Sequence, residues 1–419
     1  MYDTIFAEQH HTPAVALVNR GFVNDARSAA ASKGVPTARF VPTNIPCECT
    51  VAGKIAAGVD EVLTEVLDAL TAPLRPEEIA PAPRPTELTQ GCVFSGDLSE
   101  VQRFFYKRGW TDGLPIMPPT RDAVEEMLTG THLPPDHVVG LMIPRLGKAT
   151  VEKIAINAVM AGALPTAMPV LIAVVEAMLD PLSNYGIFQV STGSWSPFLI
   201  VNGPIRQQMR LNGSSGALSP GDMANASIGR AISLMAKNLG GARKGLEDMG
   251  VLGNPAKYSM VLAENEENSP WEPQHVQHGF ARDDNCVTVS FPNSYVQIVP
   301  RGTDDQGIID TIRDRLGKSW RQVTVLMCPS HAATLAESGW TPERLIEEIQ
   351  KTRPPVPPNG IGRLSSSDGA RVVVAGGPGA WIGLVLGVGR WVSRPIEVPA
   401  NWDRLVRKYR EYVPNYLRY

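Results

Sequence analysis

A proline-rich segment between residues 71 and 90 limits how this chain can fold more than any other feature of its sequence. The segment reads TAPLRPEEIAPAPRPTELTQ and contains five prolines. Proline lacks the backbone N–H that helices and central strands require, so a stretch this rich in proline is expected to be extended. The pattern predicts a linker over residues 75–93, which follows an N-terminal unit of residues 1–74.

The part of the chain that follows this linker is long enough to form more than one core. The protein has 419 residues, of which 43% are hydrophobic and 19% charged, a composition typical of globular proteins. Changes in local composition predict an Ala/Gly-rich α+β middle domain over residues 94–280. They predict a C-terminal α/β domain over residues 281–419. The expected fold class of the whole chain is α/β.

Charge and cysteine content argue against several classes of function. The formal net charge of -3 gives no basic footprint for nucleic acid or for an anionic membrane surface. Five cysteines in 419 residues are too sparse for a small disulfide-rich secreted protein. No signal peptide is visible at the N-terminus, and Pro165 and Pro169 interrupt the apolar stretch 154–179. These features predict a cytoplasmic protein with neither nucleic acid nor membrane as a partner.

The N-terminal unit has the pattern of alternating strands and helices. Strand-like runs at residues 14–19 and 37–43 alternate with a helical stretch at 22–34 and an amphipathic helix at 51–70. This βαβα fragment contains two strands, and two strands make a poor independent sheet. We therefore expect further strands to join it, either from later in this chain or from another polypeptide.

The succession PAVALVNRGFVNDARSAAASKGVPTARFVPTNIP resembles the second half of the UGSC family, α/β proteins named for a motif of selenocysteine or cysteine followed by Gly-Ser-Cys. A strand that ends near Phe22, the helix that follows and a turn at Gly34 and Pro36 carry the resemblance, which covers about the first 75 residues. The segment 328–350 is also similar to part of larger members of the group. The defining motif is expected before Ala14, where the sequence has no cysteine. The reactive residue of the family therefore corresponds to no position here.

The resemblance implies that the N-terminal unit is half of a domain. Because open sheet edges tend to pair, one hypothesis is that a second polypeptide supplies the other half, with its thiol or selenol, or that the chain forms a homo-oligomer. The alternative is that the later α/β region of the same chain completes the sheet.

Cys47 and Cys49 lie between a predicted strand and a predicted helix, where α/β folds often place chemistry. Thiols beside a helix N-terminus can have a lowered pKa or hold a soft metal. Their C-x-C spacing is not that of a zinc site, so two ordinary cysteines in a turn remain the simpler interpretation. We keep Cys47 as a candidate catalytic residue and expect no resident metal or cofactor.

A loop rich in glycine and serine, residues 212–221, leads into a predicted helix at 223–239. Backbone N–H groups at the start of a helix, together with nearby hydroxyls, suit a carboxylate or a phosphate. The loop lacks the lysine and the spacing of a P-loop, so it does not indicate nucleotide binding. We predict that Ser214, Ser215 and Asn225 bind substrate.

The densest polar cluster in the sequence lies at residues 248–267. Lys257 precedes an apolar run, YSMVLA, and Glu264 and Glu266 follow it. Burial can shift the pKa values of lysine and glutamate until they act as acid or base. A surface turn with solvated charges is the alternative. We predict Lys257, Glu264 and Glu266 as catalytic residues and Asn265 as a substrate-binding residue.

Three further positions lie in turns or at strand ends. Asp112 is a candidate substrate-binding residue, with a simple Asx turn as the alternative. Asn202 follows the strand-like run FLIV, a position from which its amide can meet a ligand. Cys328 and His331 lie at a strand–helix junction and invite a nucleophile–base interpretation. Residues three apart at such a junction need not face each other, so a structural role is favoured.

These patterns predict an enzyme subunit, completed by a partner chain, that performs acid–base or lyase-type chemistry on a small carboxylate-like molecule. The 212–221 loop and the segment from Lys257 to Glu266 would line its pocket. A thiol- or selenol-dependent redox complex is the second hypothesis, and a non-catalytic scaffold subunit is the third.

Overall fold

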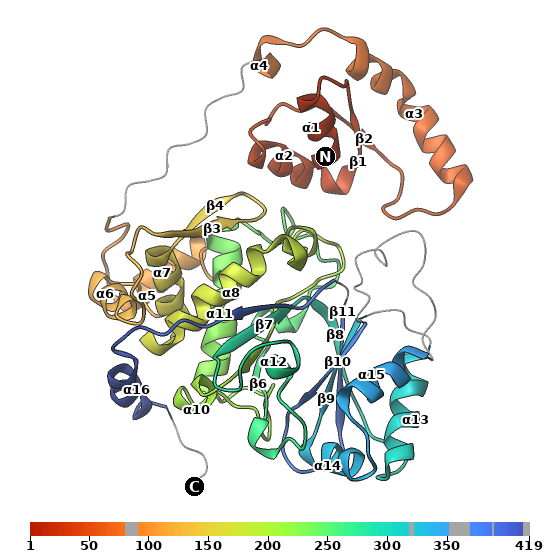
Figure 1. Ribbon diagram of the computed structural model, residues 1–419. Coiled ribbons are helices and arrows are strands. Elements are labelled where there is room, and N and C mark those ends of the chain that lie inside the picture. The colour runs from red at the N-terminus through yellow and green to blue at the C-terminus, as the bar shows by residue number, and fades with distance from the viewer. Residues whose placement is uncertain (80–90, 318–321, 352–368, 388, 414–419) are drawn as a thin grey trace.

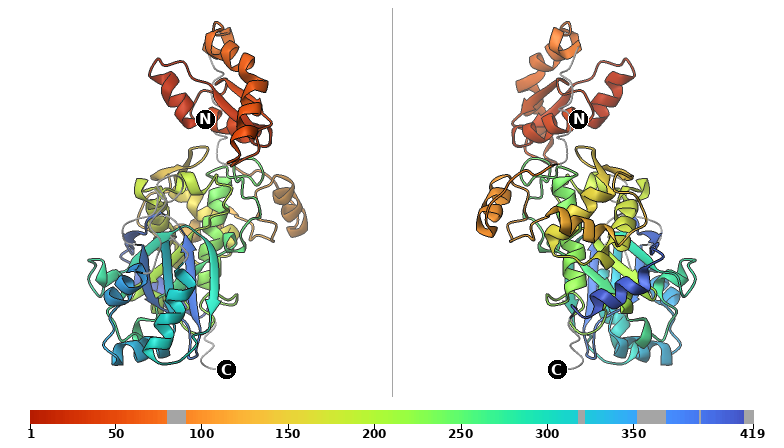
Figure 2. Two further views of the ribbon diagram at one scale, coloured as in Figure 1. Left: turned by 90° about the vertical axis from the view of Figure 1, so that its right-hand side faces the viewer. Right: turned by 90° about the vertical axis from the view of Figure 1, so that its left-hand side faces the viewer.

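A small N-terminal unit sits at one end of a larger body in the computed structural model (Figures 1 and 2). The structure describes residues 1–79, 91–317, 322–351, 369–387 and 389–413. Both parts contain helices and sheets, which confirms the predicted α/β class. Within the described ranges, no helix combines the length and the apolar character that a membrane span requires.

The N-terminal unit contains a two-stranded sheet with helices around it. Its elements are α1 (Tyr2–Gln9), β1 (Ala16–Asn19), α2 (Val23–Ser32), β2 (Phe40–Thr43), α3 (Ala52–Thr71) and α4 (Pro76–Ile79). β1 and β2 pair in parallel, with Ala16 opposite Phe40. No other strand of the described residues joins them. The expected βαβα order is present, but the later α/β region does not complete this sheet, because its strands pair with one another.

The first residues of the predicted 75–93 linker fold onto the N-terminal unit. Residues 76–79 form α4, and Glu78 Oε2 lies 2.9 Å from Arg39 Nη2 in an ion pair. This ion pair ties the start of the predicted linker to the residue before β2. Residues 80–90, which hold most of its prolines, lie outside the described residues.

Helices form the layer of the larger body that carries most of its apolar core. They are α5 (Leu98–Lys107), α6 (Arg121–Leu128), α7 (Val151–Ala161), α8 (Met168–Leu179), α9 (Tyr185–Phe188), α10 (Ile205–Gln208), α11 (Met223–Asn238), α12 (Gln274–Gln277) and α16 (Trp402–Arg410), with a hairpin of β3 (Val138–Met142) and β4 (Gly147–Thr150). Asp97 caps α5 in a capping box with Glu100. α7 and α8 are almost wholly buried, so the apolar stretch 154–179 forms two core helices.

Two four-stranded sheets follow: the first lies against this helical layer, and the second packs against the first. The first has the order β12-β7-β5-β6, formed by β5 (Phe198–Asn202), β6 (Val261–Ala263), β7 (Cys286–Ser290) and β12 (Val392–Pro395). The second has the order β10-β9-β11-β8, formed by β8 (Pro292–Ile298), β9 (Gln322–Met327), β10 (Ala370–Val374) and β11 (Ile382–Gly387). β5 and β6 are parallel, as are β9 and β10. These two parallel pairs position the candidate site.

Three helices gather around β9 and β10 of the second sheet (Figure 1). They are α13 (Asp305–Leu316), α14 (Pro329–Glu337) and α15 (Pro342–Lys351). The proline run at residues 353–358, which the sequence places in a loop, lies outside the described residues.

The first sheet crosses the predicted domain boundary between residues 280 and 281. β5 and β6 come from before this boundary, while β7 and β12 come from after it. Val287 and Val289 of β7 belong to the same apolar core as α7 and α8. Residues 94–280 and 281–419 are therefore not separate domains. Composition could not show this, because strand pairing joins segments that are distant in sequence.

Gly147 offers a test of the packing between the β3–β4 hairpin and α11. A Cβ atom at this position would overlap the carbonyl oxygen of Leu239. A backbone atom cannot move aside as a flexible side chain can. Gly147→Ala is therefore expected to destabilise the larger body by about 1–3 kcal/mol and to lower the temperature of its main thermal transition.

Gly53 serves as the control, because a Cβ atom there meets no other atom within 4 Å. Gly53→Ala should leave the main transition unchanged in differential scanning calorimetry. Equal melting curves for the Gly147→Ala variant and the wild type would contradict the described packing.

Candidate functional site

The carboxyl ends of β5 and β6 bring Asn202 and Glu264 together. The two strands are parallel, with Val201 opposite Ala263, so both leave the sheet at the same edge. Asn202 Nδ2 donates a hydrogen bond to Glu264 Oε2 at 2.6 Å. Both residues are buried. With Arg206, Glu266, Gln274 and His275 they form a group that we call the carboxylate cluster.

Arg206 neutralises the second acid of the cluster. Its Nη2 lies 2.8 Å from Glu266 Oε2, and its Nη1 donates to the backbone carbonyl of Glu264 at 2.7 Å. Glu266 Oε1 also accepts hydrogen bonds from Asn202 Nδ2 and from the backbone N–H of Gly203, both at 2.9 Å. Breaking such a buried pair is costly, because it leaves one charge without compensation. The sequence analysis did not single out Arg206, although a charged residue just after a buried strand is a visible signal.

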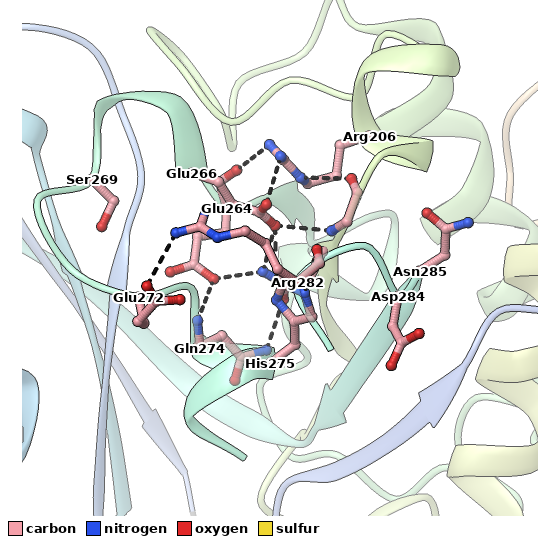
Figure 3. Close-up of polar contacts among 12 residues, drawn as sticks. Arg206, Glu264, Glu266, Ser269, Glu272, Gln274, His275, Arg282, Asp284 and Asn285 are labelled. Atoms are coloured by element: carbon pink, nitrogen blue, oxygen red, sulfur yellow. Dashed lines mark hydrogen bonds and ion pairs between the residues drawn. The ribbon is translucent and has the colours of Figure 1, made fainter. Parts of the chain in front are cut away.

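Gln274 connects the cluster to the second sheet. Its backbone N–H donates to Glu264 Oε2 at 2.9 Å, and its Nε2 donates to Asn202 Oδ1 at 2.8 Å. Its Oε1 accepts a hydrogen bond of 2.7 Å from Arg371 Nη1, on β10. The backbone and side-chain groups of one glutamine therefore contact a carboxylate, an amide and a guanidinium. Figure 3 shows Glu264 and Gln274 facing each other within this network.

Burial raises the pKa of the Glu264 carboxyl to about 7. The negative charge of Glu266 acts in the same direction, while the hydrogen bonds from Asn202 and Gln274 and the charge of Arg206 oppose the rise. Close by, His275 Nδ1 lies 3.9 Å from Glu266 Oε1. With a pKa of about 7, Glu264 gains or loses its proton near neutral pH.

Lys257 does not join the acids with which the sequence pattern associates it. Its Nζ forms an ion pair with Asp248. Lys257 precedes β6 and Glu264 follows it, so the strand separates the two side chains. The prediction that Lys257 and Glu264 line one pocket is wrong for this reason.

Asn225 and Asp112, two predicted substrate-binding residues, hold loops in place. Asn225 Oδ1 accepts from the backbone N–H of Asn212 at 2.8 Å, and its Nδ2 donates to the carbonyl of Asn212 at 3.0 Å. Asp112 pairs with Arg230 through two hydrogen bonds of 2.8 and 2.9 Å. It also accepts an Asx-turn bond of 3.2 Å from the N–H of Leu114. These partners anchor the 212–221 loop and the turn at Asp112 to α11.

Cys47 lies in the loop between β2 and α3, as the sequence predicts, and its side chain is exposed. Glu48, its neighbour, accepts a hydrogen bond of 3.0 Å from Thr192 Oγ1 of the larger body. Within the described ranges, no three His, Cys, Asp or Glu side chains are grouped closely enough to hold a metal ion. Cys47 is not part of the carboxylate cluster.

A cavity of about 340 Å³ adjoins the carboxylate cluster at the carboxyl ends of β9 and β10. Asn265 connects the two features, because its backbone N–H donates to the carbonyl of Val374 at 2.8 Å and its Nδ2 donates to that of Gly376 at 3.2 Å. The cavity is lined by residues 215–219, by Cys328 after β9 and by the glycine-rich turn after β10. Asn265 thus fixes one wall of the cavity without lining it.

The 212–221 loop forms another wall of the cavity and packs against the turn that follows β10. The backbone N–H of Gly376 donates to the carbonyl of Gly213 at 2.8 Å. A Cβ atom on Gly377 would overlap the hydroxyl oxygen of Ser215, so glycine is required for this close approach. Of the two serines predicted to bind substrate, Ser215 lines the cavity and Ser214 does not.

Cys328 is the functional candidate whose position the sequence analysis underestimated. It lies at the N-terminus of α14 and lines the cavity. Its Sγ donates to the carbonyl of Gly379 at 3.1 Å. Burial raises the pKa of the Cys328 thiol, and hydrogen bonds from the backbone N–H groups of Ser330, His331 and Trp381 offset part of the rise. At rest Cys328 is therefore a neutral thiol surrounded by donors that can stabilise a negative charge.

The comparisons with known proteins concern the N-terminal unit. Residues 1–72 match the model of the UGSC family. This match confirms the resemblance of the N-terminal unit to that family. It covers neither the carboxylate cluster nor the cavity, and the similarity of residues 328–350 to larger members stays a prediction. A search of curated proteins found no significant match to this chain.

The pKa of Glu264 predicts how stability depends on pH. Its value of about 7 in the folded protein compares with 4.5 for an ordinary glutamate. Between these two pH values the folded state keeps a proton that the unfolded state loses. Stability therefore falls as the pH rises through this window, by about 3 kcal/mol in total. Glu264→Gln removes this loss, so its free energy of unfolding should fall less with rising pH than that of the wild type.

Urea unfolding followed by tryptophan fluorescence across this pH window measures the difference. Glu272→Gln is the control, because Glu272 is exposed and pairs only at the surface with Arg282. The free energy of unfolding of Glu272→Gln should change with pH in the same way as that of the wild type. A parallel curve for Glu264→Gln would show that Glu264 ionises normally in the folded protein.

Proposed function

We propose that this protein is an enzyme subunit that binds a small, polar, carboxylate-like molecule in the cavity beside the carboxylate cluster. The position of the cavity carries this proposal. Ligands of α/β proteins commonly bind beyond the carboxyl ends of parallel strands, and this cavity lies at the ends of β9 and β10. Its volume of about 340 Å³ lies within the range of roughly 300–1,000 Å³ that is usual for small-molecule sites.

The lining of the cavity supports a ligand of modest charge. No charged side chain lines it among the described residues, whereas Ser215, Ser219 and Gln297 supply neutral hydrogen-bonding groups. The N-terminus of α14 adds the positive end of a helix dipole. Such donors suit a single carboxylate or another electron-rich group. The partly exposed rings of Tyr295 and Trp381, which also line the cavity, can contact an apolar part of the ligand.

The carboxylate cluster has a positioning role in this proposal. Glu264 is buried and does not line the cavity, so it is not placed to touch a bound molecule directly. The next residue, Asn265, holds the turn after β10 through its bond to Gly376. Protonation of Glu264 can therefore affect ligand binding through the position of this turn.

Thiol-dependent chemistry is a second candidate function, and Cys328 favours it. Among the residues that line the cavity, Cys328 and Tyr295 are those with side chains that titrate. A thiolate is the nucleophilic form of cysteine, and backbone N–H groups, those of Ser330, His331 and Trp381 among them, hydrogen-bond the Cys328 sulfur. A ligand in the cavity would lie against this sulfur. This candidate places the reactive thiol in the larger body rather than at Cys47.

Ser219 and Ser214 provide a matched test of the cavity. Both lie exposed on the 212–221 loop, but only Ser219 lines the cavity. A panel of small mono- and dicarboxylates is first screened by thermal shift, and the best binder is titrated by calorimetry. Ser219→Phe should weaken its binding at least about tenfold by filling the cavity, whereas Ser214→Phe should leave it unchanged. The proposal fails if no carboxylate binds, or if both variants bind as the wild type does.

Alkylation of Cys328 by N-ethylmaleimide tests whether the ligand covers the thiol. Cys328 should react more slowly than exposed Cys47, because burial both shields its sulfur and raises its pKa. A saturating cavity ligand should slow Cys328 alkylation by at least about tenfold without affecting Cys47, as measured by peptide mass spectrometry. Equal protection of both cysteines, or of neither, would argue against a ligand beside Cys328.

A further inference from the structure

Two aromatic side chains of the second sheet line the cavity and remain partly open to solvent. Tyr295 lies on β8 and is 43% exposed, and Trp381 lies directly before β11 and is 56% exposed. The Tyr295 hydroxyl and the Trp381 indole N–H have no hydrogen-bond partner among the described residues. Such side chains are enriched where proteins bind partners, because each combines an apolar ring with a polar atom.

Gly383 of β11 leaves bare backbone beside these rings. It lies two residues after Trp381, and residues two apart on a strand face the same side of the sheet. A Cβ atom on Gly383 would lie 3.1 Å from Tyr295 Cε2, so the Tyr295 ring approaches the strand where the side chain is missing. Glycine within a strand often marks a place that a ligand approaches closely. Gly383 lines the cavity, where a flat group can lie against the backbone and the ring.

The size of the cavity suits one ring with a short polar arm. A cavity of roughly 150 Å³ already holds a benzene molecule, and this one has a volume of about 340 Å³. Ser215 and Ser219 of the 212–221 loop also line it, and their hydroxyls have no partner among the described residues. The second sheet thus supplies flat aromatic surface, and the loop supplies neutral hydrogen-bond donors.

We propose that the ligand of the cavity is an aromatic carboxylate, whose ring lies against Tyr295 and Trp381 and whose carboxylate accepts hydrogen bonds from the 212–221 loop. This inference rests on the function proposed above and adds the substrate class to it. A saturated ring of similar size fills the same space but lacks the π system that stacks on a phenol or an indole. The two aromatic side chains therefore select aromatic over saturated carboxylates.

Matched pairs of carboxylates test this selection. Benzoate is compared with cyclohexanecarboxylate, and 3-phenylpropanoate with 3-cyclohexylpropanoate, by calorimetric titration of the full chain. The aromatic member of a pair should bind about 3- to 10-fold more tightly, because aromatic contacts contribute beyond the area that they bury. Hydrophobicity alone favours the saturated member, so the expected preference has the opposite sign.

Substitution of the two rings locates the source of the preference. Trp381→Leu and Tyr295→Leu should each reduce the ratio of the two dissociation constants by at least about twofold, whereas Trp381→Phe should largely keep it. Tyr106→Leu is the matched control, because Tyr106 is 67% exposed and does not line the cavity. This variant should bind both members of a pair as the wild type does. Circular dichroism checks that every variant is folded.

The outcomes separate this inference from the proposed function. Equal binding of the aromatic and saturated members would overturn the inference and leave a carboxylate site in place. An aromatic preference that persists unchanged in both leucine variants would also overturn it, because the ring would then bind elsewhere. Binding of no carboxylate at all would contradict the proposed function itself, and the inference with it.

Discussion

The parallel pairing of β5 with β6 determines where the functional groups of the larger body lie. It brings Asn202 and Glu264 to one edge of the sheet, where a 2.6 Å hydrogen bond joins them. Gln274 then links this pair to Arg371 on the second sheet. Because these groups are buried, each depends on its partners, and a change in one imposes a desolvation cost on the others. The network thus links the first sheet to the second.

The cavity follows from this arrangement of the sheets. Asn265, immediately after Glu264, fixes the turn that follows β10, and the 212–221 loop closes on that turn from the other side. Cys328 enters the cavity from the end of β9. In the function that we propose, the carboxylate cluster holds the loops in place and the cavity receives the ligand. Protonation of Glu264 near neutral pH is then expected to affect ligand binding through the turn after β10.

Local features of the structure could be predicted from the sequence, whereas non-local pairing could not. The alternating strands and helices of the N-terminal unit were visible because each has its own local periodicity. The pairing of β7 with β5, across the predicted boundary at residues 280–281, was not visible. Pairing across long sequence separations leaves no mark on local periodicity.

In the candidate site, too, single residues could be recognised from the sequence, whereas their contacts could not. Asn202 and Glu264 were each recognisable as polar groups at strand ends, and their contact required the parallel register of β5 and β6. Lys257 was assigned to the same pocket because it is near Glu264 in sequence, although β6 separates the two. Cys328 was set aside because its sequence neighbour His331 gave no clear dyad. Its cavity partners, Ser215 and Gly376, come from distant segments.

A crystal structure of the protein soaked with its best-binding carboxylate tests the central claim most directly. The account predicts electron density for the ligand between the 212–221 loop and the turn after β10, within contact of Cys328. Density for the ligand only at another position, with the cavity unchanged, would contradict it.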